Sequence, residues 1–358
     1  MRSYTGKTVY LGIDVHKKTY AVTAISDGQV TKRDVLKADP EVLIAYIKKY
    51  FSEAKIESAY EAGFCGFHLH RCLEAAGIKN KVVDAAGIEI AVGDRVKTDK
   101  RDSLKLATHL AGGRLKGINV PSVEREQYRI VTRLRETVAR QRSRVACQLK
   151  SLLFQHGLIR ADDKKKVSMK WTKVLEAMDL PHELKYALGH FIAMWRQLEM
   201  RVKEIQEEIG IQAQKDKATE SIYRSVPGVG PISARILANE LEDTKQFSNE
   251  RQLFSYVGLT PCEYSSGEHI RQGHITRQGK PILRKILIQV AWMAVRCDEN
   301  LAALYNQLSV RIGAKKAIVA VARRLIGQIR ACFRTGELYC PRNRKESYQQ
   351  QQLEKIAS

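Results

Sequence analysis

The sequence lacks several features that identify secreted, zinc-binding or membrane proteins. Its seven cysteines are an odd number and include no C-x-x-C pair, so neither a zinc ribbon nor a secreted disulfide framework is indicated. The most apolar window, Ile286 to Val295, is too short to cross a bilayer and contains Gln289. The N-terminus has no apolar run of the signal-peptide type, and no segment reads as an amphipathic membrane anchor. These absences predict a soluble cytoplasmic protein with reduced thiols and no membrane partner.

Acidic residues are also scarce relative to basic ones. The 358 residues include 61 Lys and Arg against 39 Asp and Glu, which gives a formal net charge of +22. An excess of this size destabilises a compact protein by self-repulsion unless a polyanion relieves it. Half of the excess lies in residues 265–344, which contain 15 basic and four acidic residues. Nucleic acid is therefore the expected partner.

Residues 8–115 alternate strand-like and helix-like patterns. Three short β-rich runs come first, followed by a helical run from Glu41 to Phe51 and then by strand, helix, strand and a helix after Asp102. This order of elements is that of a ribonuclease-H-like fold. We therefore expect an α/β domain of the ribonuclease-H-like type over residues 1–120.

The remainder of the chain is predicted to be helical. The stretch from Val123 to Gly157 reads as one long helix with eight basic and three acidic residues in its first 28 positions, and a second stretch, about Pro181 to Ile211, is expected to return antiparallel. Apolar residues at spacings close to three and four predict a coiled-coil seam in the first helix, and they are Val131, Leu134, Val138, Val145 and Leu152.

A glycine-containing turn, Pro227 to Gly230, precedes a helix predicted from about Ile232. It resembles a helix-hairpin-helix element, whose backbone N–H groups bind a phosphate, although the same pattern is also an ordinary tight turn. The length of the chain suits two or three domains. The predicted regions that follow this α/β domain are a helical coiled-coil region over residues 121–215, a mainly helical C-terminal domain over 216–340 and a polar tail over 341–358.

Four acidic residues occupy positions where this fold would bring them together. Asp14 lies in an apolar run, Glu61 ends a predicted strand, and Asp99 and Asp102 are spaced to share one face of a helix start. Each alone is more often a cap or a solvated side chain. Four carboxylates at one sheet edge would suit Mg²⁺ or Mn²⁺, and two such ions about 3.5 to 4 Å apart support phosphodiester chemistry.

Basic residues flank the last two acids, and histidines lie near the first two. Lys97, Lys100 and Arg101 are expected to guide a phosphate backbone toward the carboxylates. His16 follows Asp14 by two residues and is as consistent with a packed histidine as with a group near a metal. His68 and His70 are not spaced as a helical ligand pair. We assign none of the three histidines a role.

Two adjacent serines, Ser265 and Ser266, precede Gly267 in a predicted turn. His269 follows closely, but no Gly-x-Ser-x-Gly elbow and no matching acid accompany it, so a Ser-His-Asp hydrolase is not indicated. A plain surface turn is the alternative. Nearby cations favour a phosphodiester as the electrophile, and attack by a serine would form a phosphoserine link that conserves bond energy for rejoining. The cations expected to bind phosphate are Arg271, Arg277, Lys280, Arg284 and Lys285.

Taken together, the motifs LGIDVHKK, YEAG, KTDKRDS, SVPGVGPISA, FSYVGLTP and YSSGEHIRQGHITRQGKPILR span about residues 8–335. In this order they resemble the bridge-RNA-guided insertion-sequence transposases of the "IS-one-ten" family, which combine a RuvC-like Asp-Glu-Asp-Asp domain with a C-terminal serine domain. The doubled serine resembles the subgroup called IS-eleven-eleven.

The resemblance implies a role for each candidate residue. Asp14, Glu61, Asp99 and Asp102 would bind Mg²⁺, and Ser266, the serine next to the glycine, would be the nucleophile. The implied partners are donor and target DNA, a noncoding bridge RNA and further copies of the chain, as a dimer or tetramer in which a serine of one protomer completes a carboxylate site of another. The implied setting is a bacterial or archaeal cytoplasm, in association with the nucleoid. If base pairing with the RNA selects the DNA sequence, the protein itself needs only to bind the nucleic-acid backbone. That would explain its large excess of basic residues.

Three other functions are weighed against this one. A RuvC-like metal-dependent nuclease or junction resolvase would need no serine chemistry. A kinase or ATPase is disfavoured because His16, Lys17 and Lys18 stand where a small phosphate-binding turn is needed, and because the Gly273 to Lys280 segment is not a Walker motif. A non-catalytic relic of a transposase would bind nucleic acid only, although all four acids and the serine are present.

Overall fold

The chain divides into two compact units, residues 1–121 and 122–358. Each is described by itself. The computed structural model describes residues 4–84, 99–160, 162–163, 165–264, 266, 269 and 271–341, and the side chains of residues 99, 100 and 272 are outside that description.

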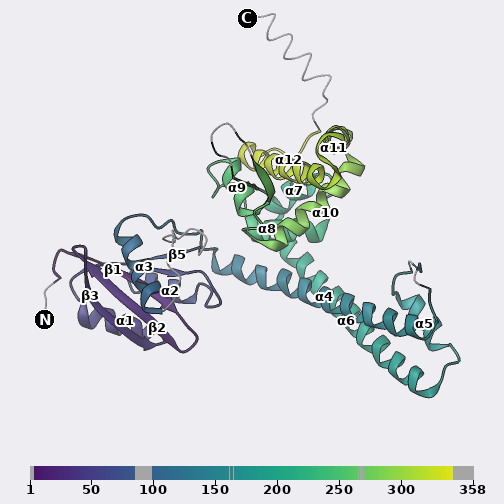
Figure 1. The fold of residues 1–358 in the computed structure, drawn as a ribbon, viewed down its shortest axis with the longest axis horizontal. Helices are drawn as coiled ribbons and strands as arrows, with labels where there is room; N and C mark the ends of the chain where they lie inside the picture. The colour runs from purple at the N-terminus through teal and green to yellow at the C-terminus, as the bar shows by residue number, and fades with distance from the viewer. Residues whose placement is uncertain are drawn as a thin grey trace, which may run out of the picture. The chain divides into compact units, whose positions relative to one another are not determined.

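The first unit contains a five-stranded mixed sheet in the order β3-β2-β1-β4-β5 (Figure 1). The first three strands form an antiparallel meander, while β4 and β5 continue the sheet in parallel with β1. Asp27 and Gly28 both have positive φ angles, 51° and 75°, as the two-residue turn between β2 and β3 requires. The strands are β1 (Thr8–Val15), β2 (Thr19–Ser26), β3 (Gln29–Lys37), β4 (Lys55–Glu61) and β5 (Lys79–Val83).

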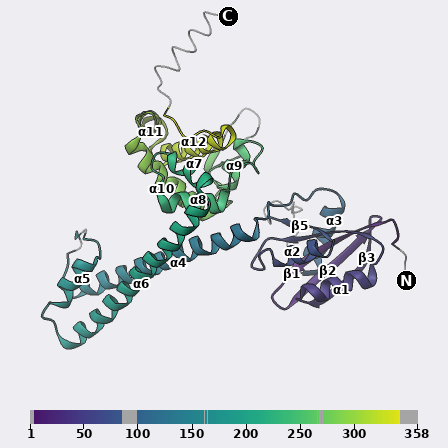
Figure 2. The same ribbon diagram turned by 180° about the vertical axis from the view of Figure 1, so that it is seen from behind.

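Helices cover both faces of this sheet. The helices α1 (Pro40–Tyr50) and α2 (His68–Ala75) pack against one face and complete the larger apolar core of the unit. On the other face lies α3 (Asp99–Ala111), whose Leu106 and Leu110 form a smaller core with residues of β4 and β5. The two views of the ribbon show this three-layer arrangement (Figure 2).

The second unit begins with a long helical hairpin. The helix α4 (Val123–Gln155) starts at Ser122, whose hydroxyl accepts a hydrogen bond from the Arg125 N–H. The helix α6 (His182–Lys215) returns along it, and α5 (Met169–Glu176) packs near the turn. Leucines and isoleucines of α4, α5 and α6 form an apolar cluster at this end of the hairpin.

The C-terminal part of the second unit packs helices around α8 (Pro231–Leu241). Every residue of α8 from Ala234 onward is buried, so this helix is enclosed on all sides. A short antiparallel hairpin joins α9 to α10. The other elements are α7 (Lys217–Ser225), α9 (Glu250–Tyr256), β6 (Pro261–Glu263), β7 (Gln272–Ile275), α10 (Pro281–Cys297), α11 (Glu299–Ile312) and α12 (Ala314–Thr335).

These elements confirm the predicted order over residues 8–111 and the division into a mixed α/β first region and a mostly helical remainder. The sheet topology is compatible with the expected ribonuclease-H-like fold. Among the described residues, no helix is both long and apolar enough to cross a bilayer.

The predicted apolar seam of α4 is wrong at Leu134. Leu134 is 48% exposed, whereas Arg129, Thr132 and Glu136 are buried. The reason lies in the partner: this half of α4 packs against α8, which offers it carbonyl and carboxylate oxygens rather than apolar side chains. Periodicity alone therefore identified the helix but not the face that it buries.

Candidate active site

Two of the predicted acids end adjacent parallel strands. The register of β1 and β4 aligns Ile13 with Tyr60, and Asp14 and Glu61 are the next residues of the two strands. Consecutive residues at the same ends of hydrogen-bonded parallel strands occupy one edge of the sheet. The fold therefore brings these two acids to the same edge, as predicted from their order in the sequence.

Both acids lie on the face that α3 covers. Side chains alternate between the faces of a strand, so Asp14 shares a face with Gly12, and Glu61 shares a face with Ala59. Ala59 packs in the small core with α3. A Cβ atom at Gly12 would lie 2.0 Å from the Ser103 carbonyl oxygen. Only glycine at this position lets α3 approach β1 so closely.

The first turn of α3 carries the other two predicted acids. Ser103 is fixed there, since its Oγ lies 2.9 Å from Thr23 Oγ1 and both residues are buried. The neighbouring Asp102 is half-buried. The described part of the helix includes Asp99 and therefore starts before Asp102, the residue after which it was predicted, but the side chain of Asp99 lies outside the described residues. The packing of α3 at Gly12 thus places Asp102 near the edge that carries Asp14 and Glu61.

This set of acids suits a hard divalent cation in donor type, because carboxylate oxygens are the ligands that Mg²⁺ and Mn²⁺ prefer. The side chains are not gathered around a common point: among the described residues, no group of three or more His, Cys, Asp or Glu side chains is close enough to hold a metal. His16 Nε2 lies 3.2 Å from Asp14 Oδ2. The sequence places this histidine two residues after Asp14 but does not predict the contact, because the orientation of the imidazole ring depends on the backbone conformation at the end of β1.

Ser266 lies near the tip of the hairpin formed by β6 and β7, and it is exposed. It forms an isolated bridge with His269, in which the Ser266 N–H donates to the His269 carbonyl and the His269 N–H donates to the Ser266 carbonyl, both at 3.2 Å. The pairing extends the hairpin beyond the two strands. The predicted nucleophile is thus held by backbone hydrogen bonds on a surface that a large substrate can reach.

The base of this hairpin is held by close backbone contacts. Gly258 and Gly279 have φ angles of 69° and 89°, and a Cβ atom on Gly279 would lie 2.2 Å from the Tyr256 carbonyl oxygen. Arg284 Nη1 donates to the carbonyl oxygens of Gln278 and Gly279, at 3.3 and 3.4 Å. The two ends of the hairpin segment therefore cross at a junction that only glycine permits, and Arg284 acts on the protein backbone there.

The predicted phosphate-binding cations fall into different groups. Arg101, Arg271 and Arg277 are exposed. Lys280 Nζ lies 2.7 Å from Glu240 Oε2, and Lys285 Nζ lies 2.6 Å from Glu136 Oε2, so both lysines form ion pairs within the protein. Lys97 and the side chain of Lys100 lie outside the described residues.

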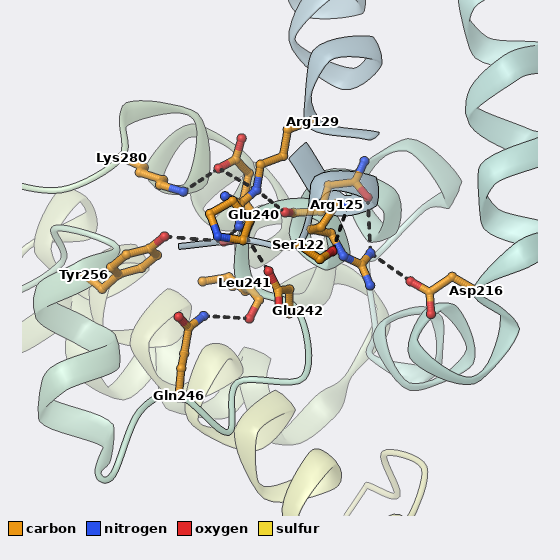
Figure 3. Close-up of polar contacts among 12 residues, drawn as sticks. Ser122, Arg125, Arg129, Asp216, Glu240, Leu241, Glu242, Gln246, Tyr256 and Lys280 are labelled. Atoms are coloured by element: carbon orange, nitrogen blue, oxygen red, sulfur yellow. Dashed lines mark hydrogen bonds and ion pairs between the residues drawn. The ribbon is translucent and has the colours of Figure 1, made fainter. Parts of the chain in front are cut away.

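Glu240 is the centre of a buried ionic network that sequence reasoning did not identify (Figure 3). Its side chain is fully buried. Arg133 Nε and Nη2 donate to its two oxygens at 2.9 and 3.2 Å, Lys280 donates at 2.7 Å, and Arg129 Nε lies 3.9 Å away. Burial acts to raise the pKa of the Glu240 carboxyl, but Lys280, Arg133 and Arg129 outweigh it and hold the pKa below its ordinary value.

A second part of the same network fixes the start of α4. Arg125 Nη1 lies 2.9 Å from Asp216 Oδ2, and the fully buried Arg235 of α8 lies 2.7 Å from the same oxygen. Arg129 Nε donates to the Asn239 carbonyl (Figure 3). These contacts tie α4, the end of α6 and α8 together next to the hairpin that carries Ser266. They also account for the arginine-rich character of α4, part of which faces inward.

The glycine turn before α8 packs inside the unit. A Cβ atom on Gly228 would lie 2.7 Å from both the Ala294 nitrogen and the Val290 oxygen, so the turn contacts the backbone of α10. This contact explains the glycine at position 228 by close packing, which is the alternative that the sequence left open.

The Glu240 network predicts that replacing Glu240 destabilises the protein much more than replacing an exposed glutamate. Replacing Glu240 by Gln leaves Lys280 and Arg133 without their carboxylate, and breaking a buried pair in this way costs about 3–5 kcal/mol. The exposed Arg201–Glu204 pair, at 3.0 Å, is the control, since Glu204→Gln should cost at most about 1 kcal/mol. All three tryptophans, Trp171, Trp195 and Trp292, lie in the second unit, so urea unfolding followed by tryptophan fluorescence reports on it directly.

The pH dependence of the free energy of unfolding gives a second test of the Glu240 network. Because the folded-state pKa of Glu240 is below the unfolded value of about 4.3, its stabilising contribution is fully present above that pH and is lost as the pH falls through the lower folded-state value. The stability gap between wild type and E240Q should therefore narrow under acid conditions. A difference of less than about 1 kcal/mol between the unfolding free energies of wild type and E240Q at neutral pH would show that the network contributes little to stability.

Two family models match the chain. The model described as "Transposase IS116/IS110/IS902 family" matches residues 220–306, which include Ser266. The model described as "Transposase", for the DEDD domain of IS110 proteins, matches residues 11–157, which include the four predicted acids.

Similar proteins align along most of the chain. The protein y4qE of Sinorhizobium fredii, named as a transposase, is 28% identical over 90% of this chain and 87% of its own length. The transposase for insertion sequence element IS1111A of Coxiella burnetii is 25% identical over 92% and 90% of the two chains. The transposase for insertion sequence element IS1533 of Leptospira borgpetersenii is 26% identical over 80% and 85%. With both candidate sites inside matched regions, the protein belongs to the IS110/IS116/IS902 family of insertion-sequence transposases.

Proposed function

We propose that this transposase cuts and rejoins DNA strands through a covalent phosphoserine intermediate formed on Ser266. The observation that carries the proposal is the position of Ser266, exposed near the tip of a hairpin whose base is fixed by the Gly258–Gly279 crossing. A serine hydroxyl in that position is accessible to a DNA backbone, and the rigid base limits the directions from which it attacks. Membership of a transposase family makes DNA the substrate.

Asp14, Glu61, Asp99 and Asp102 are the proposed ligands of a divalent ion in the same reaction, with Mg²⁺ or Mn²⁺ as the candidates. Support comes from the sheet register and from the packing of α3 at Gly12, and the DEDD domain suggests that a divalent metal is needed. When bound, such an ion stabilises charge on the oxygens of a phosphodiester. The chain's own contribution is to orient the carboxylates along one sheet edge and to fix α3 beside it.

We assign the proposed phosphate contacts first to the exposed Arg271 and Arg277, with Arg101 serving the carboxylate region. Lys280 and Lys285 are paired with Glu240 and Glu136, which favours a structural role for these two lysines. The phosphate-binding surface would then be smaller than the sequence suggests, and closer to Ser266.

A covalent-trapping experiment tests the serine. A DNA substrate that is nicked near its cleavage point prevents rejoining, so an adduct should accumulate as a slow band on a denaturing gel with wild type and with the matched control Ser265→Ala. No such band should form with Ser266→Ala. Robust cleavage by Ser266→Ala in the presence of Mg²⁺ would instead favour a metal-dependent nuclease or junction resolvase that makes no use of the serine.

We further propose that a bridge RNA guides target and donor choice. The charge of +22 supplies backbone-binding capacity without base-specific readout, and base pairing would provide the specificity. The doubled serine, Ser265 and Ser266, supports placing the protein in the IS1111-like subgroup, and action as a dimer or tetramer is part of the same proposal.

RNA that co-purifies with the protein tests the guide. Expression together with the flanking sequence of its element should enrich one discrete noncoding species encoded by that element, and removing it with ribonuclease should abolish sequence-specific recombination while non-specific DNA binding persists. Recovery of random host transcripts alone would contradict RNA guidance and leave the serine chemistry unaffected.

A further inference from the structure

The serine hairpin places a histidine directly opposite the proposed nucleophile. Ser266 and His269 exchange both of their backbone hydrogen bonds, each at 3.2 Å. In an antiparallel ladder, residues that exchange both bonds face each other, and their side chains project from the same face of the hairpin. Their Cβ atoms then lie about 4.5–5.5 Å apart, a separation that a serine hydroxyl and an imidazole ring can bridge with a hydrogen bond.

A second pair extends the same face. The Tyr264 N–H donates to the Arg271 carbonyl at 2.9 Å, in the same register as Ser266 and His269. Because side chains alternate along each strand, Tyr264 and Arg271 project from the face that carries Ser266 and His269. All four residues are exposed, and Tyr264 is 77% exposed. The hairpin therefore presents a hydroxyl, an imidazole, a guanidinium and an aromatic ring on one solvent-accessible surface.

From this arrangement we infer that His269 is the general base that activates Ser266. The inference rests on the proposed serine chemistry and adds a catalytic residue to it. A serine hydroxyl is a weak nucleophile at neutral pH, and an adjacent imidazole is the commonest group that activates it. The absence of a hydrolase elbow, which argues against acyl transfer, does not affect this role, since a phosphodiester needs no oxyanion hole of that kind. The guanidinium of Arg271 on the same face suits a phosphate oxygen.

The step balances in protons and electrons. The Ser266 hydroxyl proton passes to an imidazole nitrogen of His269 as the Oγ–P bond forms. The P–O bond to the nucleoside breaks with its electron pair on the leaving oxygen, which takes a proton from solvent water, and the imidazolium releases its proton to solvent. In the rejoining direction a protonated His269 donates to Oγ as the phosphoserine bond breaks, while the attacking nucleoside hydroxyl loses its proton to solvent.

The test measures the rate of adduct formation on the nicked DNA substrate, with the full-length protein and its nucleic-acid partners. His269→Ala and His269→Gln should each form the adduct about 10²- to 10³-fold more slowly than wild type, with unchanged DNA affinity. His274→Ala is the matched control, because His274 is exposed on the same hairpin but lies in β7, outside the Ser266–His269 pair, and it should keep the wild-type rate. The acid limb of the wild-type pH–rate profile should disappear in His269→Gln.

Chemical rescue separates proton transfer from a structural effect. Imidazole added to the buffer should restore much of the rate of His269→Ala and none of the rate of Ser266→Ala. Wild-type rates in His269→Gln, or a slow His269→Ala that imidazole does not accelerate, would overturn the assignment of His269 while an adduct on Ser266 would still stand. An absence of any adduct in wild type would overturn both this inference and the proposed function.

Discussion

A buried carboxylate organises the second unit. Glu240 has no exposed surface, and an ionised group in such a place is tolerated only when cations and hydrogen bonds replace water. Arg133 from α4 and Lys280 from the end of the hairpin segment supply this compensation. The same requirement fixes the helix α4, the central helix α8 and the segment that carries Ser266 relative to one another, because moving any of them would leave a buried charge without its partner.

Glycines meet a second requirement, which is close approach of backbone to backbone. Gly12 allows α3 to contact β1 beside Asp14, and Gly258 and Gly279 allow the two ends of the serine hairpin to cross. Each candidate reactive group thus sits beside a contact that a Cβ atom would prevent. Loops position reactive groups well only when a rigid scaffold holds their ends, and these glycines provide that rigidity in the two units separately.

Sequence reasoning reached the α/β order and the edge position of Asp14 and Glu61, because strand and helix periods are local signals and parallel strand ends meet at a predictable edge. The predictions are wrong where the contacting residues are distant in the chain. Leu134 is predicted to be buried but is exposed, because α8 offers polar groups to α4. Lys280 read as a phosphate-binding cation, but its carboxylate partner, Glu240, lies 40 residues away. The pairing of Ser266 with His269 depends on hairpin register, which the glycine-containing turn does not specify by itself.

We propose that DNA strand exchange by this transposase passes through a covalent bond to one hydroxyl on the hairpin surface. Peptide mass spectrometry of wild-type protein, trapped on nicked DNA and digested with nuclease and protease, detects this bond. The expected result is a nucleotide mass on the peptide that contains Ser266, with fragment ions that place it on that residue. A nucleotide attached to a different side chain, or cleaved DNA with no modified peptide, would contradict it.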